Sequence, residues 1–232
     1  MKPLVLTLRT NPDERLDLSA LVPHRLSGRT ADEIARLELQ TGRQRVTVGD
    51  IFRVRGGDSR YVRIEGGTDR FDQVGQDMTD GEIVVEGEVG SQAGRSMAGG
   101  RLVINGDAGG WAASGMRGGH IEIAGSAGDR LGGPLAGEVT GMRGGVVVVR
   151  GDVGDRAGDR LRRGTIVLAD GCDELSPTFL DCGVHDFIVM RLMAAFVRDY
   201  SAVAAAALRS PLRRLAGDMA VLGKGEILCA CA

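Results

Sequence analysis

The chain contains the stretch GGRLVINGDAGGWAASGMRGGHIEIAGSAG at residues 99–128, in which glycine pairs precede short apolar runs. The same arrangement recurs through the middle of the chain, where such a run follows each of Gly81, Gly100, Gly119, Gly145 and Gly164. The spacings between these glycines are 19, 19, 26 and 19 residues. We interpret them as a 19-residue period with one seven-residue insertion, in an extra loop around residues 131–138. A fixed period of this length predicts a repeat architecture.

Each period contains a five-residue run typical of a β-strand, because β-branched residues alternate with other side chains. The runs are EIVVE (82–86), RLVIN (101–105), HIEIA (120–124), VVVVR (146–150) and TIVLA (165–169). Strand alternation gives these inward pairs: Ile83 and Val85, Leu102 and Ile104, Ile121 and Ile123, Val147 and Val149, Ile166 and Leu168. A 19-residue repeat has no room for a crossover helix. Successive strands should therefore stack as coils of a single-stranded parallel β-helix, which makes the fold mainly β.

The residues between the strands also recur at fixed positions. The chain is expected to turn where a close approach of coils excludes a side chain, at Gly87, Gly106, Gly125, Gly151 and Gly171. Inward-pointing residues are expected next, at Val89, Ala108, Ala127 and Val153. A column of flexible apolar residues, interpreted as core and not as metal or haem ligands, consists of Met97, Met116, Met142 and Leu161.

The two ends depart from the repeat. Near the N-terminus, Thr30-Ala-Asp-Glu33 is a capping-box sequence that predicts a helix with Ile34, Leu37 and Leu39 on its apolar face, ending at Gly42. A strand is expected from Val46 to Val54, and residues 61–80 form a degenerate first coil.

Near the C-terminus the repeat stops after Gly171. An Ala- and Met-rich helix is expected from Asp186 to Leu208 and a second helix from Pro211 to Leu222. We therefore divide the chain into an N-terminal cap (1–60), a glycine-repeat β-helix (61–171) and a C-terminal helical cap and tail (172–232). Helices at both ends would cover the strand edges of the β-helix.

Composition narrows the class of protein. The 29 basic and 31 acidic residues nearly balance, so no global field favours binding to nucleic acid or to a membrane surface. No apolar run reaches the roughly 20 residues of a membrane span, and the N-terminus lacks a signal peptide's apolar core. A cytoplasmic protein is therefore expected. Only Lys2 and Lys224 are lysines, an arginine bias typical of a GC-rich bacterial genome.

The repeat unit G-x-[IV]-x-[IV]-x-G-x-[AV]-G-x-x-[AG]-x-x-x-M-x-G-G resembles that of the family joining the C-terminal domain of glutamate synthase to the C subunit of formylmethanofuran dehydrogenase. Members of this family are right-handed β-helices, so the resemblance implies that handedness. Four segments are similar to the dehydrogenase chain: TADEIARL (30–37), DIFRVRG (50–56), LSPTFLDCG (175–183) and GKGEIL (223–228). The resemblance covers nearly the whole chain.

The resemblance implies a non-catalytic structural subunit of an enzyme complex. One such complex is the formylmethanofuran dehydrogenase of methanogens, with a molybdenum or tungsten pterin site. The other is the formyltransferase/hydrolase complex of methylotrophic bacteria, which acts in tetrahydromethanopterin-linked formaldehyde oxidation and which the arginine bias favours. The alternative is a glutamate synthase-like β-helix subunit that couples to a separate glutamine amidotransferase.

For the bacterial complex, the resemblance implies formyl transfer to a furan coenzyme, methylofuran or methanofuran, on the D subunit, and zinc-dependent hydrolysis to formate on the A subunit. The implied partners are the sister A, B and D subunits, and a dimer of heterotetramers is left open. No cofactor and no family catalytic residue are implied for this chain.

Few residues have the spacing of a catalytic or metal site. Cys172, Cys182 and His185 supply three potential metal ligands near the last coil, but no fourth ligand or supporting carboxylate is evident. Cys182 beside His185 is interpreted as packing and not as an activated nucleophile. His24 and His120 are expected at the surface. We therefore predict no catalytic residue and no metal site here.

Arg117, Arg143 and Arg162 directly follow the methionine and leucine column. In stacked coils they would form a ladder of like charges about 4.8 Å apart, which repel one another unless something anionic lies across them. We call these three residues the arginine ladder and predict that it contacts a partner or an acidic coenzyme tail. A second column, expected to be balanced locally by cation–π and ion-pair contacts, contains Trp111, Arg130 and Arg156, flanked by Asp129 and Asp155.

Overall fold

The computed structural model describes residues 2–42, 45–170, 175, 177–186 and 211–230. Its elements in chain order are β1 (Pro3–Leu8), β2 (Leu16–Asp17), α1 (Pro23–Leu26), α2 (Ala31–Ala35), β3 (Glu38–Leu39), β4 (Val46–Thr47), α3 (Val48–Ile51), β5 (Phe52–Arg55), β6 (Asp58–Glu65), β7 (Phe71–Asp72), β8 (Glu82–Glu86), β9 (Arg101–Ile104), β10 (His120–Ile123), β11 (Arg143–Val149), β12 (Arg163–Leu168), β13 (Leu180–His185), β14 (Leu212–Gly217), the 3-10 helix η1 (Met219–Val221) and β15 (Gly225–Ala230).

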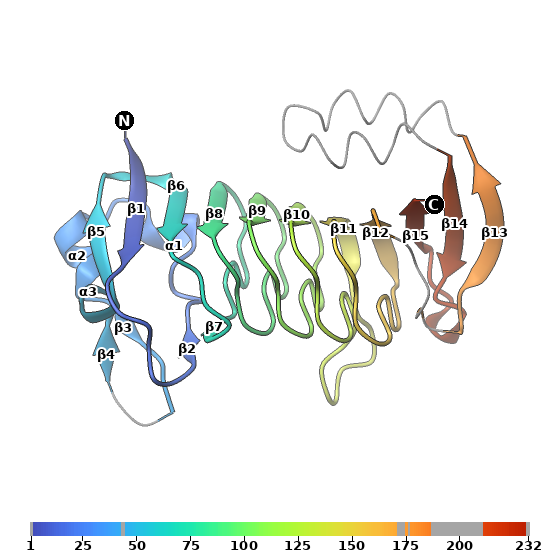
Figure 1. The fold of residues 1–232 in the computed structure, drawn as a ribbon, viewed down its shortest axis with the longest axis horizontal. Helices are drawn as coiled ribbons and strands as arrows, with labels where there is room; N and C mark the ends of the chain where they lie inside the picture. Colours follow the sequence, from blue (N-terminus) through green and yellow to red (C-terminus); the bar gives the residue numbers. More distant parts are fainter. Residues whose placement is uncertain (1, 43–44, 171–174, 176, 187–210, 231–232) are drawn as a thin grey trace.

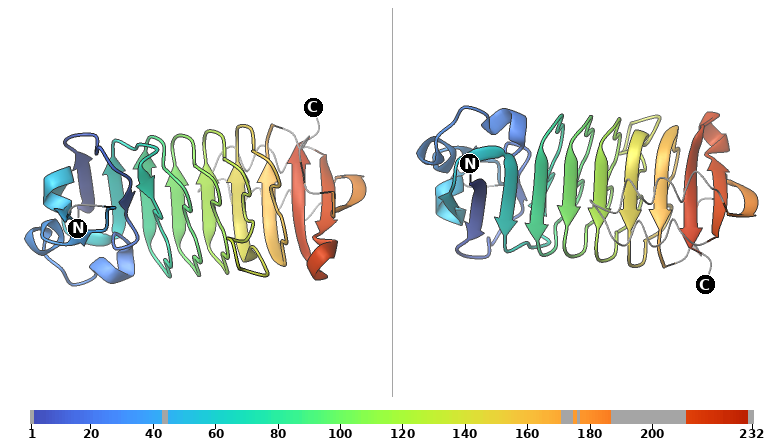
Figure 2. Two further views of the ribbon diagram at one scale, coloured as in Figure 1. Left: turned by 90° about the horizontal axis from the view of Figure 1, so that it is seen from below. Right: turned by 90° about the horizontal axis from the view of Figure 1, so that it is seen from above.

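One large mixed sheet runs along the molecule (Figure 1). It has 11 strands in the order β13-β14-β15-β12-β11-β10-β9-β8-β6-β1-β5. All pairings from β1 through β6 to β12 and on to β15 are parallel, whereas β1–β5, β13–β14 and β14–β15 are antiparallel. Figure 2 shows these strands side by side, with α1, α2 and α3 gathered at the N-terminal end. The prediction of a mainly β fold is confirmed.

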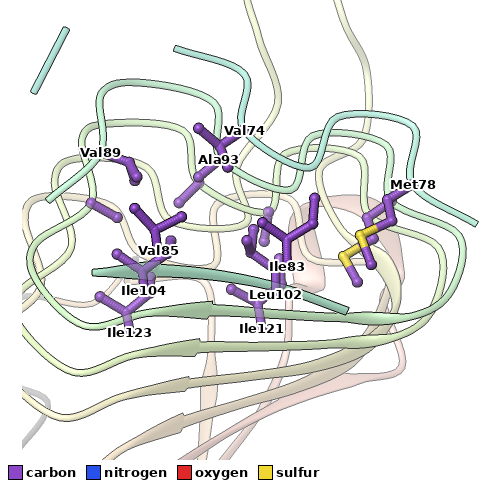
Figure 3. Close-up of a cluster of buried hydrophobic side chains, with 14 of the residues drawn as sticks. Val74, Met78, Ile83, Val85, Val89, Ala93, Leu102, Ile104, Ile121 and Ile123 are labelled. Atoms are coloured by element: carbon purple, nitrogen blue, oxygen red, sulfur yellow. The ribbon is translucent and has the colours of Figure 1, made fainter. Parts of the chain in front are cut away.

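Strands of consecutive repeats pair at the predicted offset. Ile123 on β10 lies opposite Ile104 on β9 and Val149 on β11. The ten predicted inward side chains are all buried, with at most 1% exposed, and so are the four residues of the methionine and leucine column. Figure 3 shows Ile83, Val85 and their counterparts on β9 and β10 pointing to the same side, toward Val89 and Met78. The strand runs, their inward faces and the core column are therefore confirmed.

The segments that return between strands also stack. A second line of parallel bridges joins Thr68, Val89, Ala108, Ala127 and Val153 in succession. Three aspartates add cross-repeat bonds, in which a carboxylate accepts a backbone N–H of the next repeat. These bonds join Asp72 to Ser91 at 2.7 Å, Asp107 to Ser126 at 2.7 Å and Asp129 to Asp155 at 3.0 Å. Asp72 and Asp129 occupy one repeat position and Asp107 another, so these bonds form in some repeats and not in every one.

The N-terminal predictions hold only in part. Thr30 and Glu33 form the predicted capping box, but α2 ends at Ala35, so the extension of the helix to Gly42 is wrong. The single strand from residue 46 to 54 is also wrong. Thr47 and Asp50 form a second capping box that starts the helical turn α3 between β4 and β5. Both α2 and α3 pack against the edge strand β5.

At the C-terminal end, the predicted helix from Pro211 to Leu222 is wrong. This segment forms β14 and η1, because β14 pairs along its whole length with β15. The local sequence pattern does not predict this pairing. β15 in turn continues the parallel strands, with Ile227 opposite Ile166 and Cys229 opposite Leu168. The predicted helix from 186 to 208 lies outside the described residues from position 187 onward, as does Gly171.

The outward face of the last parallel strands is apolar as well. Val148, Val167 and Leu228 alternate with inward-pointing residues, yet at most 2% of each is exposed. The repeat predicts one buried face per strand. In β11, β12 and β15 buried side chains therefore lie on both faces, as is typical of parallel strands.

Candidate partner-binding surface

The backbones of the arginine ladder lie on consecutive repeats of the stack. The backbone N–H of Arg117, Arg143 and Arg162 each donates to the core-column carbonyl of the preceding repeat: Met97 at 2.7 Å, Met116 at 2.6 Å and Met142 at 2.9 Å. All three side chains are exposed. Arg143 Nε donates to Thr140 Oγ1 at 3.0 Å. With respect to the described residues, none of the three arginines forms an ion pair.

Two further cations extend the ladder toward the C-terminal end. Arg163 lies opposite Arg143 on the neighbouring strand, and the Lys224 N–H donates to the carbonyl oxygen of Arg162 at 2.8 Å. Both side chains are exposed. We call the ladder with these two residues the basic strip.

The sequence carries a weaker signal for Lys224 than for Arg163. Arg163 stands where the three preceding repeats have Gly99, Gly118 and Gly144, so it could have been found from the repeat. Lys224 precedes Gly225 as Arg163 precedes Gly164, but the long-range pairing of β15 with β12 is needed to place it beside the last repeat.

The longest repeat carries its seven extra residues at positions 134–140, not around 131–138. Leu131 is fully buried in the stack. The Met142 N–H donates to the Gly132 carbonyl at 2.6 Å, the same bond that Met116 makes with Ala113 in the preceding repeat at 3.1 Å. We call residues 134–140 the insertion loop. It protrudes from the stack as the yellow-green segment below β11 in Figure 1.

The two histidines expected at the surface are half-buried. His24 Nδ1 and His120 Nε2 are buried and have no hydrogen-bond partner among the described residues. Burial lowers the pKa of His120, which nearby Glu122 opposes and Arg101 reinforces. His120 is therefore held toward its neutral form beside a charged pair.

Cys182 and His185 do not form a nucleophile–base contact. His185 Nε2 bonds the backbone carbonyl oxygen of Cys182 at 2.6 Å, and Cys182 Sγ donates to the Leu180 carbonyl at 3.6 Å. A catalytic base would instead bond the thiol itself. Cys172 lies outside the described residues. Over the described ranges, no group of three His, Cys, Asp or Glu side chains is arranged to hold a metal ion.

A second charged region, beside α1, is compensated within the chain. A hollow of about 580 Å³ beside α1 is lined by Arg60 and Arg101, which pair with Asp58 and Glu82 at 3.0 Å each. The basic strip differs from this hollow because its charge is not paired by the described residues.

In the second column, which contains Trp111, Arg130 and Arg156, the positive charge of Arg130 is paired differently from the prediction. Arg130 pairs with Asp159 at 3.6 Å, not with its neighbour Asp129. Trp111 Nε1 is buried without a hydrogen-bond partner among the residues that the structure describes.

Comparison with known proteins shows the family. No family model matches the chain. The C subunit of the formyltransferase/hydrolase complex Fhc of Methylorubrum extorquens is 45% identical over 258 residues, which cover 96% of this chain and 97% of that protein. The chain belongs to the family of this Fhc protein.

A solved structure agrees with this family. The crystal structure of the formyltransferase/hydrolase complex (FhcABCD) from Methylorubrum extorquens with methylofuran contains a similar chain, with a TM-score of 0.73 and 34% identity. The match covers 98% of this chain and 100% of that one.

A second group of relatives matches less of the chain. The C subunit of the tungsten-containing formylmethanofuran dehydrogenase 2 of Methanothermobacter thermautotrophicus is 36% identical over 94 residues, 38% of this chain and 35% of that protein. The likeness to the bacterial protein is therefore the more extensive of the two. Among the helices of the described ranges, none has the length and apolarity that crossing a membrane requires.

Proposed function

We propose that this chain is the non-catalytic scaffold subunit of a formyltransferase/hydrolase complex, which converts formyl-tetrahydromethanopterin to formate through a formylated furan coenzyme. The observation that carries the proposal is the 45% identity, along 96% of the chain, to the C subunit of Fhc. The contact of His185 with the Cys182 carbonyl, in place of the thiol, supports a role without chemistry. Under this proposal the coenzyme and zinc act on sister chains in the cytoplasm.

The proposed fold is a right-handed parallel β-helix (61–171) between an N-terminal cap (1–60) and a C-terminal cap (172–232). Two observations support it: the parallel pairing of strands from consecutive repeats and the second line of bridges between the returning segments. Parallel strands that follow one another in a sheet are connected with right-handed geometry in nearly all proteins. The stack would give the complex a long, rigid surface.

Co-purification tests the proposed function. A tagged form of this chain, expressed with the A, B and D subunits, should recover all three, and mass photometry should distinguish one heterotetramer from a dimer of heterotetramers. Recovery of a flavin or amidotransferase chain in their place, after expression in the native host, would favour a glutamate synthase-like coupling subunit. The isolated chain should show no formyltransferase or hydrolase turnover. Turnover that is lost on changing Cys182 or His185 would overturn the scaffold role.

Within this complex we assign the arginine ladder to an acidic patch of a sister subunit or to a polyanionic coenzyme tail. The support is its exposure and the lack of ion-pair partners among the described residues. Planar guanidinium groups bind carboxylates in pairs, which suits either partner.

A triple substitution tests the ladder. Replacing Arg117, Arg143 and Arg162 by alanine should leave the fold intact but weaken assembly, or weaken coenzyme use in an intact assembly. The difference from the parent should be largest at low salt and should shrink as salt rises, because salt screens the attraction that the arginines supply. The matched control replaces three exposed arginines of the N-terminal cap, Arg9, Arg53 and Arg55, with the same change in net charge. If both variants assemble and turn over alike at every salt concentration, the ladder is only a solvated face.

A further inference from the structure

We propose that the insertion loop is a docking element for a partner protein, with Val139 as its apolar anchor among flanking arginines. The partner's matching surface would be an apolar pocket bordered by carboxylates. The inference rests on the proposed function only in naming that partner as a chain of the formyltransferase/hydrolase complex.

The insertion loop is not needed to build its repeat. Gly133 and Gly141 meet where the loop leaves and rejoins the stack, since a Cβ on Gly141 would lie 3.1 Å from the Gly133 Cα. The Met142 bond to the Gly132 carbonyl closes the coil below the loop just as in the shorter repeats. The repeat is therefore complete without these seven residues, and their role lies outside the stack.

The loop is held in place by two arginine side chains from other repeats. Arg95 Nη2 bonds Glu138 Oε1 at 3.2 Å, and the other carboxylate oxygen of Glu138 accepts the Leu135 N–H at 3.3 Å. Arg160 Nη1 donates to the Val139 carbonyl at 3.5 Å, and the Arg160 carbonyl accepts the Gly141 N–H at 3.1 Å. A loop fixed in this way loses little conformational freedom on binding, which favours affinity.

Val139 lies at the exposed end of this braced segment, with 71% of the residue accessible to solvent. A single exposed valine needs no explanation by itself. Here, however, it is fixed to Arg160 through its carbonyl and is followed by Thr140, which accepts a hydrogen bond from Arg143 of the basic strip. Arginine is enriched at protein interfaces, so an exposed apolar side chain with arginines beside it suits a contact with another protein.

The same surface distinguishes a protein from a small polyanion. A soluble polyanion would pair with the arginines, but Val139 would add little to its binding free energy, because a flexible polycarboxylate has no apolar pocket. A folded partner uses both features. Its pocket would bury the valine, and its carboxylates would pair with Arg143 and Arg160.

Loop removal tests the proposal in the assembled complex. Deleting residues 134–140 joins Gly133 to Gly141 and restores the 19-residue spacing of the other repeats. The shortened chain should keep its melting temperature within a few degrees, while its affinity for the sister subunits falls about tenfold or more. Val139→Asp should cause a similar loss of affinity, and Val139→Ile should retain the parent's affinity.

The controls separate this inference from the proposed function. Thr10→Asp adds the same charge at an exposed position of the N-terminal cap and should leave affinity unchanged. An equal loss in Thr10→Asp and Val139→Asp, or parental affinity in Val139→Asp, would overturn the docking role while the proposed function stands. If the deletion unfolds the chain, the Val139 pair of variants decides the question. Failure of the parent chain to assemble with the sister subunits would instead defeat the proposed function.

Discussion

The middle of the chain and its C-terminal end add strands to the same sheet by different rules. From β8 to β12 each strand pairs in parallel with the next strand of the sequence, at an offset set by the repeat. At the C-terminal end the order is β12-β15-β14-β13, so the last strand of the chain lies inside the sheet and β13 lies at its edge. The middle is built from local information, whereas the end depends on residues that meet only after the chain has folded back.

The two regions also differ in how well they are buried. The inward residues of β8 to β12 are almost fully buried, whereas Leu180 and Val184 on β13 are 60% and 58% exposed. The middle should therefore unfold as one cooperative unit, and the end should open more easily. Substitutions in the two regions test this difference.

The largest effect is expected in the middle, at Ile123. This side chain is fully buried between its counterparts on β9 and β11. Ile123→Asp places an unpaired carboxylate there, which loses its hydration without compensation. We expect destabilisation of at least about 4 kcal/mol, with loss of folding or assembly. Thermal denaturation followed by circular dichroism measures it, with Ile123→Val as the mild control. An unchanged melting temperature would place Ile123 outside the core.

A smaller and more local effect is expected at the C-terminal end, at Asp218. This buried carboxylate accepts the backbone N–H groups of Arg160 and Ala220 at 2.7 Å each and so joins the cap to the last repeat. Asp218→Ala leaves both donors unsatisfied, at a cost of about 2–3 kcal/mol. Hydrogen exchange should accelerate in β14 and β15 but not in β8 to β10. Equal acceleration in both regions would show that the end is not a separate unit.

The same contrast explains what could be predicted from the sequence. Ile104 and Ile123 could be assigned to one column because each repeat has the same pattern of strand, turn and core residues. The strand β14 could not be predicted, since the spacing of its leucines also fits a helix. Its pairing with β15 decides that the segment forms a strand. The repeat-like run Gly225-Glu226-Ile227 was the available signal for that last strand. In the candidate site, the register predicts the ladder, whereas Lys224 depends on long-range pairing.

Two single glycines, one in the stack and one in the insertion loop, allow these two regions to be compared by substitution. Gly119 and Gly137 have φ values of +90° and +88°, so alanine is strained at both positions. A Cβ on Gly119 would also lie 2.8 Å from the Gly100 carbonyl oxygen, whereas a Cβ on Gly137 meets nothing within 4 Å. Gly119→Ala should therefore cost about 1–2 kcal/mol more than Gly137→Ala. Equal denaturation midpoints for the two variants would contradict the close stacking of the repeats.

The smallest effect is expected on the outward side of the middle strands, at His120. Burial lowers the pKa of His120 in the folded chain, and the unfolded chain restores the ordinary value near 6.5. Below that pH the unfolded state binds more protons than the folded state, so stability should fall as the pH drops from about 6.5 through the lower folded pKa. Above it, both states carry a neutral imidazole and the contribution is constant. Denaturant titrations at pH 7.5 and 5.5 should show a smaller decline for His120→Asn than for the parent, because the variant lacks this titration. An identical decline in both would mean that the carboxylates alone set the acid sensitivity of the stack and that the imidazole gains a proton as easily in the folded chain as in the unfolded one.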